Sequence, residues 1–396
     1  MAPEGCHQGE EGKGKRKESI HGGARDEKSC VNRTANKVKK TELEFNEFSL
    51  VSTAILEYVL TTMSAAPGKK IRYGIVGFGS FAERSIAPAI RASSNSELVA
   101  IQKRSLRAAQ EKAAEHNVPL AFSDVEDLVA HDDVDAVFIV SANSCHCVET
   151  LAAARAKKHV LVEKPMAMNI AEARKMIEAC RKNRVKLMVG HMIRFSPLIL
   201  RIRELIRSDA IGAVTFARAE FVYDGSRSQR KWLWDQRVAG GGPLFDIGVH
   251  CLDTLRFLLE DEVVSVKSHL APVPTKTRTE STADVALRFS GGTLASIHCS
   301  FAASIRRSAI EIIGTKGTLF ANQFTLGSRA TALTVVTGDL PPNGEQRTEM
   351  IDVPNLYVEE IAHFSSCILN NARPSIPGEV GLENQKVLDD ALKKGG

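Results

Sequence analysis

Short apolar runs alternate with amphipathic stretches from residue 71 onward. Runs of strand length bounded by polar residues predict strands, and segments with a 3.6-residue apolar period predict helices. The predicted strands are 71–76, 97–101, 135–140, 159–163 and 185–190, and the predicted helices are 80–92, 105–116, 146–157 and 170–183. Near-continuous apolar strands are typical of a parallel sheet covered on both faces. Residues 70–191 are therefore predicted to form a doubly wound, Rossmann-type α/β domain.

The pattern changes after a further predicted helix at 197–207. Long alternating strands are predicted at 214–223, 283–289 and 293–301, and Ser290-Gly291-Gly292 is typical of a hairpin turn between the last two. Residues 192–396 are therefore predicted to form an α+β substrate-binding domain with a large, mostly antiparallel sheet.

One face of this second sheet is predicted to be apolar and to pack against helices. Its members alternate along the two hairpin strands: Val285, Leu287, Phe289, Ala295, Ile297, Cys299 and Phe301. The opposite face is only weakly polar at Ala286, Leu294, Ser296 and Ser300. A sheet surface of this kind predicts a homo-oligomer, either a homodimer or a homotetramer.

The first 69 residues differ in composition from the rest. Residues 1–40 contain few branched apolar side chains, and the apolar stretch 48–60 is too short to span a membrane and too far from Met1 for a signal peptide. We expect residues 1–69 to be a disordered or mis-assigned extension. Met63, just before the first strand, is a plausible true start.

Composition narrows the class of protein. With 396 residues, 43% hydrophobic and 25% charged, the chain is typical of a globular enzyme of two or three domains. The net charge of +5 is spread along the chain, so a nucleic-acid partner is not expected, and no apolar run is long enough for a membrane span. Eight scattered cysteines favour a reducing, cytoplasmic location. Cys145-His146-Cys147 lacks a second ligand pair, so no metal site is predicted.

A glycine-rich segment follows the first predicted strand and opens the first helix. It reads Gly77-Phe78-Gly79-Ser80-Phe81-Ala82 and matches the dinucleotide-binding pattern G-x-G-x-x-G/A in the required context. The first glycine permits a tight turn, the second lets a pyrophosphate approach the backbone, and the alanine lets the helix pack closely on the sheet. The helix N-terminus supplies N–H groups to the phosphates. The alternative is a glycine turn without a ligand.

The end of the second strand bears on the choice of cofactor. A site that prefers NAD usually carries an acid there for the ribose 2′-hydroxyl, but this chain has Lys103, Arg104 and Ser105. A guanidinium can bind a 2′-phosphate in a bidentate manner. The sequence therefore predicts NADP(H), with NAD(H) less favoured. The alternative is a basic loop that is only solvated and binds no phosphate.

Three further signatures line up with the glycine motif. They are Glu163-Lys164-Pro165 at a strand end, the run from Gly190-His191 through Arg194 to Pro197, and Gly240-Gly241-Gly242 followed by Asp246, His250 and Asp253. Asp246 and His250 are four residues apart and so share one face of a helix. A histidine near its ordinary pKa can move the proton of a substrate hydroxyl, and a lysine can hold a developing alkoxide.

In this order and spacing, the signatures resemble the Gfo/Idh/MocA family of sugar and polyol oxidoreductases over about residues 70–396. The resemblance implies that Lys164, Asp246 and His250 are catalytic and that the peptide before Pro165 is cis. It also implies a cofactor site that includes Asn143, His146, Glu163, Lys164 and Arg194, with a structural role as the alternative for Arg194. The family usually has Thr-Pro-Asn where this chain has Ser141-Ala142-Asn143.

The leading hypothesis is an NADP-dependent oxidoreductase that moves hydride between nicotinamide and a secondary alcohol or carbonyl carbon of a sugar, polyol or cyclic diol. Tyr223, Trp232 and Trp234 are aromatic candidates for packing the substrate ring, or else for capping the core. Two alternatives remain at this stage. One is a non-catalytic NADP-binding regulator of the same fold, which would be expected to lose the lysine or the histidine; the other is the family branch that cleaves glycosides with bound NAD.

Overall fold

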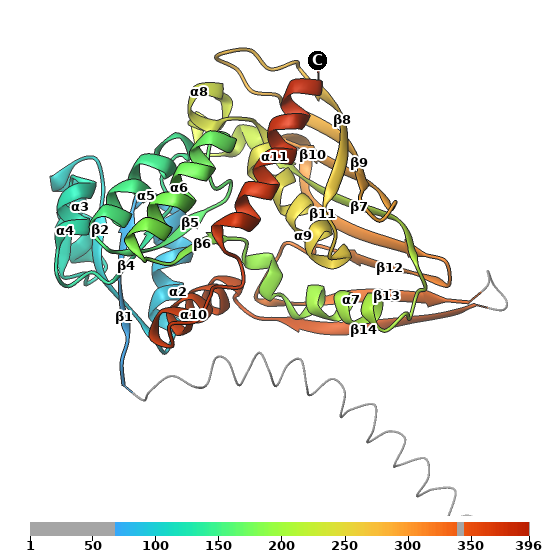
Figure 1. Ribbon diagram of the computed structural model, residues 1–396, viewed down its shortest axis with the longest axis horizontal. Helices are drawn as coiled ribbons and strands as arrows, with labels where there is room; N and C mark the ends of the chain where they lie inside the picture. Colours follow the sequence, from blue (N-terminus) through green and yellow to red (C-terminus); the bar gives the residue numbers. More distant parts are fainter. Residues whose placement is uncertain (1–67, 339–343, 396) are drawn as a thin grey trace, which may run out of the picture. The chain divides into compact units, whose positions relative to one another are not determined.

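The computed structural model describes residues 68–338 and 344–395, which contain two β-sheets flanked by helices (Figure 1). The expectations for residues 1–67 lie outside the described residues. Among the helices of the described ranges, none is long and apolar enough to cross a membrane.

The first sheet is parallel throughout and has the strand order β3-β2-β1-β4-β5-β6, the order of a doubly wound nucleotide-binding fold. Its strands are β1 (Ile71–Val76), β2 (Ser96–Gln102), β3 (Leu120–Phe122), β4 (Ala136–Ile139), β5 (His159–Glu163) and β6 (Leu187–Gly190). Its helices are α2 (Ala87–Ala92), α3 (Leu106–Glu115), α4 (Val125–Ala130), α5 (His146–Arg155) and α6 (Ile170–Asn183). The Rossmann prediction is confirmed. Strand β3 and helix α4, both short, were not predicted.

The second sheet is mostly antiparallel, as predicted, with the order β14-β13-β12-β11-β7-β10-β9-β8 and one parallel pair, β7 with β10. Its strands are β7 (Val214–Asp224), β8 (Val263–Ala271), β9 (Thr282–Phe289), β10 (Leu294–Ser300), β11 (Ala302–Gly314), β12 (Gly317–Asn322), β13 (Arg329–Thr337) and β14 (Glu345–Val353). The later helices are α7 (Pro197–Arg207), α8 (Gln236–Ala239), α9 (Val249–Leu259), α10 (Leu356–Leu369) and α11 (Gly378–Lys394).

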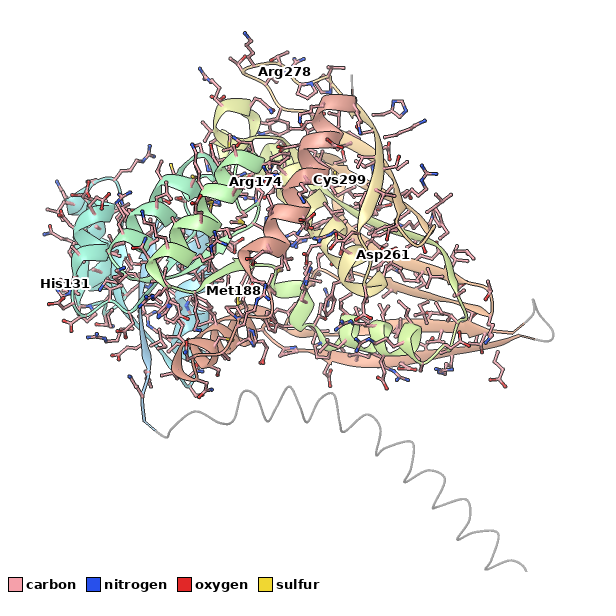
Figure 2. All side chains as sticks on the ribbon, in the orientation of Figure 1. His131, Arg174, Met188, Asp261, Arg278 and Cys299 are labelled. Atoms are coloured by element: carbon pink, nitrogen blue, oxygen red, sulfur yellow. The ribbon has the colours of Figure 1, made fainter. Side chains whose placement is uncertain are left out.

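The core of the second domain lies between this sheet and helices α7, α9 and α11 (Figure 1). All seven side chains predicted for the inner face of the hairpin are buried, including Cys299, which Figure 2 labels. The predicted turn joins β9 to β10, and the carboxylate of Asp261 accepts the N–H of Gly291 there at 2.8 Å. Ser300 differs from the other three outer-face positions because it is buried; its hydroxyl pairs with that of Thr282 at 2.8 Å.

The chain returns to the first sheet at its C-terminal end. Helix α10 packs on α2, β1 and β2, and α11 lies against both α6 and β8. Tyr73 of β1 and Ser365 of α10 share a buried hydrogen bond of 2.8 Å. Two helices of the stretch 192–396 therefore also contact the first domain. The sequence did not indicate these contacts.

Candidate active site

A cavity of about 640 Å³ is lined by residues from both sheets. The first domain contributes Ser80, Phe81, Ser141, Asn143, His146, Glu163 and Lys164, and the second contributes Tyr223, Arg230, Trp232, Asp246 and His250. The first group follows the carboxyl ends of β1, β4 and β5, where doubly wound sheets bind ligands. The structure thus brings Lys164, Asp246 and His250 into one cavity, although 82 residues separate the first two along the chain.

The glycine loop has the local geometry that a dinucleotide requires. Gly77 has φ +82°, and a Cβ there would lie 2.7 Å from the Cα of Ser141, so only glycine fits. A Cβ on Gly79 would have only the carbonyl oxygen of Gly77 within 4 Å, at 3.9 Å. The backbone at Gly79 is therefore open to close approach by a ligand, while Ala82 is buried against the sheet.

The other residues of the loop divide between core and cavity. Phe78 is buried and its ring meets that of His116 edge-on, with centroids 5.6 Å apart, so only its backbone can face a ligand. Ser80 and Phe81 line the cavity, and the ring of Phe81 meets that of Tyr357 at 5.6 Å. The helix that follows begins with a π-helical turn (Ala82–Ile86) before α2.

The residues Lys103, Arg104 and Ser105, which follow β2, differ in their surroundings. The ammonium of Lys103 donates to the carbonyl of Phe78 at 2.7 Å, and the hydroxyl of Ser105 caps α3 by accepting the N–H of Ala108 at 3.4 Å. Both side chains therefore brace local structure. Arg104 is exposed, so its guanidinium is open to solvent. Sequence reasoning missed Gln102, whose side-chain oxygen accepts the Gly77 N–H at 3.1 Å.

Lys164 follows β5 and is held against the second domain. Its peptide bond to Pro165 is cis, as the resemblance implied. Its ammonium donates to the backbone carbonyl of Asp246 at 2.7 Å and lies 3.3 Å from that residue's Oδ1. The side chain is only 12% exposed and lines the cavity, and its two contacts with Asp246 hold the ammonium in place.

Asp246 is surrounded by donors of the protein itself. Arg230 donates to both carboxylate oxygens at 2.9 Å, and the hydroxyl of Tyr223 donates to Oδ2 at 3.0 Å. Burial alone would raise the pKa of Asp246, but Arg230 and Lys164 outweigh it and hold that pKa far below its usual range. The carboxylate is thus ionised and fixes the two cations. Arg230 was not found from the sequence, where it stands in a stretch without periodicity or motif.

His250 lies in the first turn of α9 and is 7% exposed. Burial, reinforced by the charge of Lys164, holds its pKa well below 6.5, so the imidazole is neutral at pH 7. Within the part of the chain that the structure describes, its Nδ1 has no hydrogen-bond partner, and no hydrogen bond joins it to Asp246. His250 also lines the cavity, and a neutral imidazole there is suited to accept a proton from a bound hydroxyl.

Three residues proposed for the cofactor site line the cavity and also brace its wall through hydrogen bonds to the backbone. Asn143 is buried and donates to the carbonyl of Ala239 at 2.8 Å, which ties the loop after β4 to α8. His146 pairs with the carbonyl of Pro165 at 3.0 Å, and burial lowers its pKa to about 4. Glu163 accepts the N–H of Lys164 at 3.1 Å, and burial raises its pKa to about 7 despite the neighbouring lysine charge.

Arg194 lies outside the cavity lining. Its guanidinium makes two 2.8 Å bonds to Asp253 and stacks on the ring of Phe257 at 5.0 Å. Asn384 of α11 joins the same buried network by donating to Asp253 at 2.9 Å and pairing with His191 at 3.0 Å. This geometry favours the structural alternative for Arg194, at the junction of α9 and α11.

The aromatic candidates also separate. Trp232 lines the cavity, with the guanidinium of Arg230 5.8 Å from its ring centroid. Trp234 instead packs edge-on against Phe301, 5.4 Å between centroids, and so caps the core.

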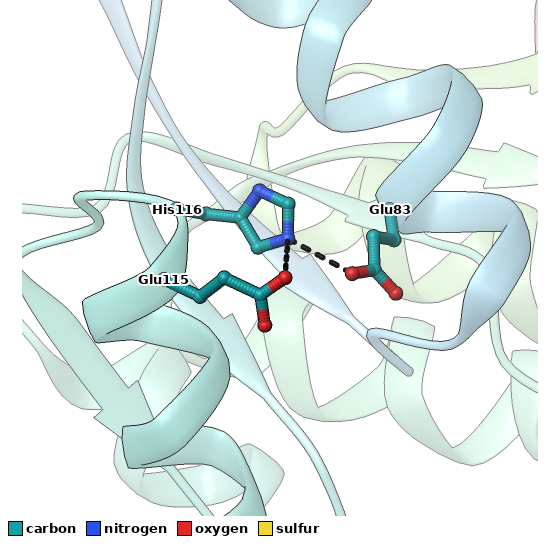
Figure 3. A group of neighbouring side chains, drawn as sticks. All are labelled: Glu83, Glu115 and His116. Carbon is teal, nitrogen blue, oxygen red and sulfur yellow. Dashed lines mark hydrogen bonds and ion pairs between the residues drawn. The ribbon is translucent and has the colours of Figure 1, made fainter.

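One group of potential metal ligands stands out in the described ranges, formed by Glu83, Glu115 and His116 (Figure 3). The ammonium of Lys112 donates to Glu83 at 2.6 Å and to Glu115 at 2.8 Å. Both carboxylates therefore already share an ion-pair partner from the protein. Cys147 and His146 do not form such a group, and the six described cysteines are free thiols.

Comparison with known proteins assigns both domains. Residues 71–191 match the model of an oxidoreductase family with an NAD-binding Rossmann fold, and residues 199–320 match the GFO/IDH/MocA C-terminal domain. The 1,5-anhydro-D-fructose reductase of Ensifer adhaerens is 33% identical over 315 residues, which cover 78% of this chain and 92% of that protein.

Two further proteins extend the comparison. The trans-1,2-dihydrobenzene-1,2-diol dehydrogenase of Danio rerio is 33% identical over 63% of this chain and 73% of its own length. The crystal structure of aldose-aldose oxidoreductase from Caulobacter crescentus, complexed with glycerol, is 27% identical and superposes with a TM-score of 0.74 over 83% of this chain and 98% of its own.

Proposed function

The chain belongs to the GFO/IDH/MocA family of oxidoreductases, and on this premise we propose that it is an NADP-dependent enzyme that interconverts a secondary alcohol and a carbonyl in a sugar, polyol or cyclic diol. The observation that carries the proposal is the convergence of Lys164 and His250 on a cavity that also contains the open glycine loop. The similarity to an anhydrosugar reductase and a diol dehydrogenase supports the choice of substrate class.

Lys164 and His250 have different roles at the reacting oxygen. Lys164 offers its ammonium as a hydrogen-bond donor and a positive charge, which stabilise negative charge on that oxygen. His250, neutral at pH 7, accepts the hydroxyl proton during oxidation and returns it during reduction. The nicotinamide supplies or accepts the hydride when it is bound. Asp246 is a positioning residue, because its carboxylate holds Lys164 and Arg230 rather than the imidazole.

The residues of the glycine loop and of the loop after β2 would hold the dinucleotide. Gly79 lets the phosphates approach the backbone, Ser80 and Phe81 border the cavity, and exposed Arg104 would bind the 2′-phosphate. The lack of an acid at the end of β2 supports NADP(H) over NAD(H). Retention of both Lys164 and His250 speaks against a purely regulatory protein.

We also propose a homodimer or homotetramer built on the outer face of the second sheet, in a cytoplasmic setting that suits six free thiols. Register places Leu294, Phe216, Ile313 and Phe320 on this face, and Leu294 is 53% exposed. An apolar stripe across several strands is typical of an oligomer interface. Light scattering at micromolar concentration should give a multiple of the chain mass; the monomer mass alone would contradict the oligomer.

A substrate panel tests the catalytic proposal. Aldoses, anhydrosugars, inositols and cyclic diols would be oxidised with NADP⁺ or NAD⁺, and the corresponding ketones reduced with NADPH or NADH, while absorbance at the nicotinamide band is followed. We expect turnover with at least one member and a preference for the phosphorylated cofactor. Cofactor that binds but is never turned over would favour the regulatory alternative. Glycoside cleavage without net change of cofactor would favour the glycosidase alternative.

A further inference from the structure

The cavity wall contains a long irregularity in strand β11. Ala302 pairs with Asp224 of β7 and Arg307 pairs with Val222, so four residues of β11 lie opposite the single residue Tyr223. Bulges of this kind re-aim side chains and are common next to active sites. Ser304 and Arg306 of the bulge line the open cavity and are exposed to solvent, whereas Ile305 between them is 67% exposed and is not part of the lining. The bulge thus places two polar side chains at the cavity.

Arg306 differs from the other cations around the cavity. Lys164 and Arg230 are both bound to Asp246, and Arg227 is bound to Asp224 at 2.9 Å. Arg84 follows the glycine loop, at the cofactor end. Arg306 has no ion pair with any acid in the part of the chain that the structure describes; its guanidinium lies over the ring of Phe221, 5.1 Å from the centroid. It is a positive charge at the substrate end of the cavity without a negative partner from the protein.

The position of Arg306 limits where an anion can sit on the substrate. The ring of Phe221 is 6.3 Å from that of His250 and 5.1 Å from the guanidinium, so the imidazole and the guanidinium are at most about 11 Å apart. A single sugar ring with its substituents is small enough to lie within this separation, so one substrate can contact both groups through hydrogen bonds of about 2.8 Å.

We propose that the substrate of this enzyme is a sugar or cyclic polyol whose ring carries a carboxylate, and that Arg306, presented by the β11 bulge, binds this carboxylate. The inference rests on the proposed function, because it names the substrate class of the same cavity. A guanidinium matches the planar, singly charged carboxylate with two parallel hydrogen bonds. A phosphate dianion would need a second unpaired cation, which the substrate end does not supply among the described residues. The hydroxyl of Ser304 offers a further donor or acceptor beside it.

The test compares hexuronates with their uncharged amides. The enzyme loaded with NADP⁺ would be titrated calorimetrically with D-glucuronate, D-galacturonate and D-mannuronate, and with the amide of each. At least one hexuronate should bind about tenfold or more tightly than its amide, because a charge-assisted pair is lost in the amide. If no hexuronate binds better than its amide, the proposal is wrong.

Two adjacent arginines give a matched pair of variants. Arg306→Gln should remove the preference for the carboxylate over the amide. Arg307→Gln makes the same charge change one residue along the strand, where the guanidinium pairs with Glu220 at 3.3 Å outside the cavity lining, and should keep the preference. Equal behaviour of the two variants would overturn the assignment to Arg306.

Turnover, measured separately, distinguishes this inference from the proposed function. Arg306-dependent binding of a hexuronate that no cofactor oxidises would support the carboxylate site and contradict the proposed reaction. Oxidation of neutral sugars, with no hexuronate preferred over its amide, would support the reaction and contradict the carboxylate site.

Discussion

Replacing Asp246 by asparagine should cost both stability and turnover, because this buried carboxylate holds two cations in place. The substitution preserves the shape of the side chain but removes its charge. Lys164, which is only 12% exposed, then loses the counter-ion that it shares with Arg230. One of the two acceptor oxygens becomes an amide NH2 group, which cannot accept a hydrogen bond from either cation.

The size of the stability loss follows from burial. Removing one partner of a buried ion pair costs about 3–5 kcal/mol, and we expect the lower end, about 3 kcal/mol, because Arg230 is 39% exposed and can regain water. For a chain of this size that corresponds to a fall in melting temperature of roughly 4–5 °C. Turnover should fall by about a hundredfold, since displacing a group that contacts the reacting atoms by about 1 Å has that effect.

Thermal melting and steady-state turnover measure the two effects. Asp209→Asn is the control: its carboxylate is 64% exposed and pairs with Lys316 at the surface, so its loss should cost less than about 1 kcal/mol. An Asp246→Asn protein that melts within about 1 °C of the unsubstituted enzyme and keeps its turnover would refute the idea that this carboxylate organises the site.

Three further outcomes are expected. Glu163 has a pKa of about 7 in the folded protein against 4.5 ordinarily, so its burial lowers stability as pH rises from about 4.5 to 7; Glu163→Gln should be more stable than the unsubstituted protein by about 3 kcal/mol at pH 8 and by little at pH 4, as pH-dependent melting would show. Arg104→Ala should weaken NADPH by about ten- to a hundredfold in a fluorescence titration and leave NADH nearly unchanged; equal losses would show that Arg104 does not bind the 2′-phosphate. Gly77→Ala should greatly weaken binding of either cofactor, because its Cβ would lie 2.7 Å from the backbone of Ser141 at φ +82°; unchanged binding would contradict the role of the loop.

Several helices and strands could be predicted from the sequence because their signals are local. Strand 71–76 and helices 170–183 and 197–207 coincide with the elements of the structure, since each is a complete apolar or amphipathic period with clear ends. Gly77 likewise indicates a turn with positive φ, a backbone conformation that other residues rarely adopt. The family resemblance then pointed to Lys164, Asp246 and His250, which the fold does bring together.

The contacts that fix the charge and position of Lys164, Asp246 and His250 could not be predicted from the sequence, because they depend on segments that are distant along the chain. Arg230 binds Asp246 from a stretch whose sequence has no periodicity. The ammonium of Lys103 donates to a backbone carbonyl, and its sequence position did not indicate this bond. The β11 bulge is a matter of register between two strands, which neither strand shows alone. The same holds for α10 and α11, whose amphipathic pattern does not say that they return to the first sheet.

The central claim is that His250 moves the substrate proton while Lys164 stabilises the oxygen, and the turnover of His250→Ala tests it most directly. On a substrate from the panel, this variant should be slower by at least about a hundredfold, should bind NADPH as the unsubstituted enzyme does, and should regain part of its rate with added imidazole. A His250→Ala enzyme that kept more than about half of the original turnover would contradict the account.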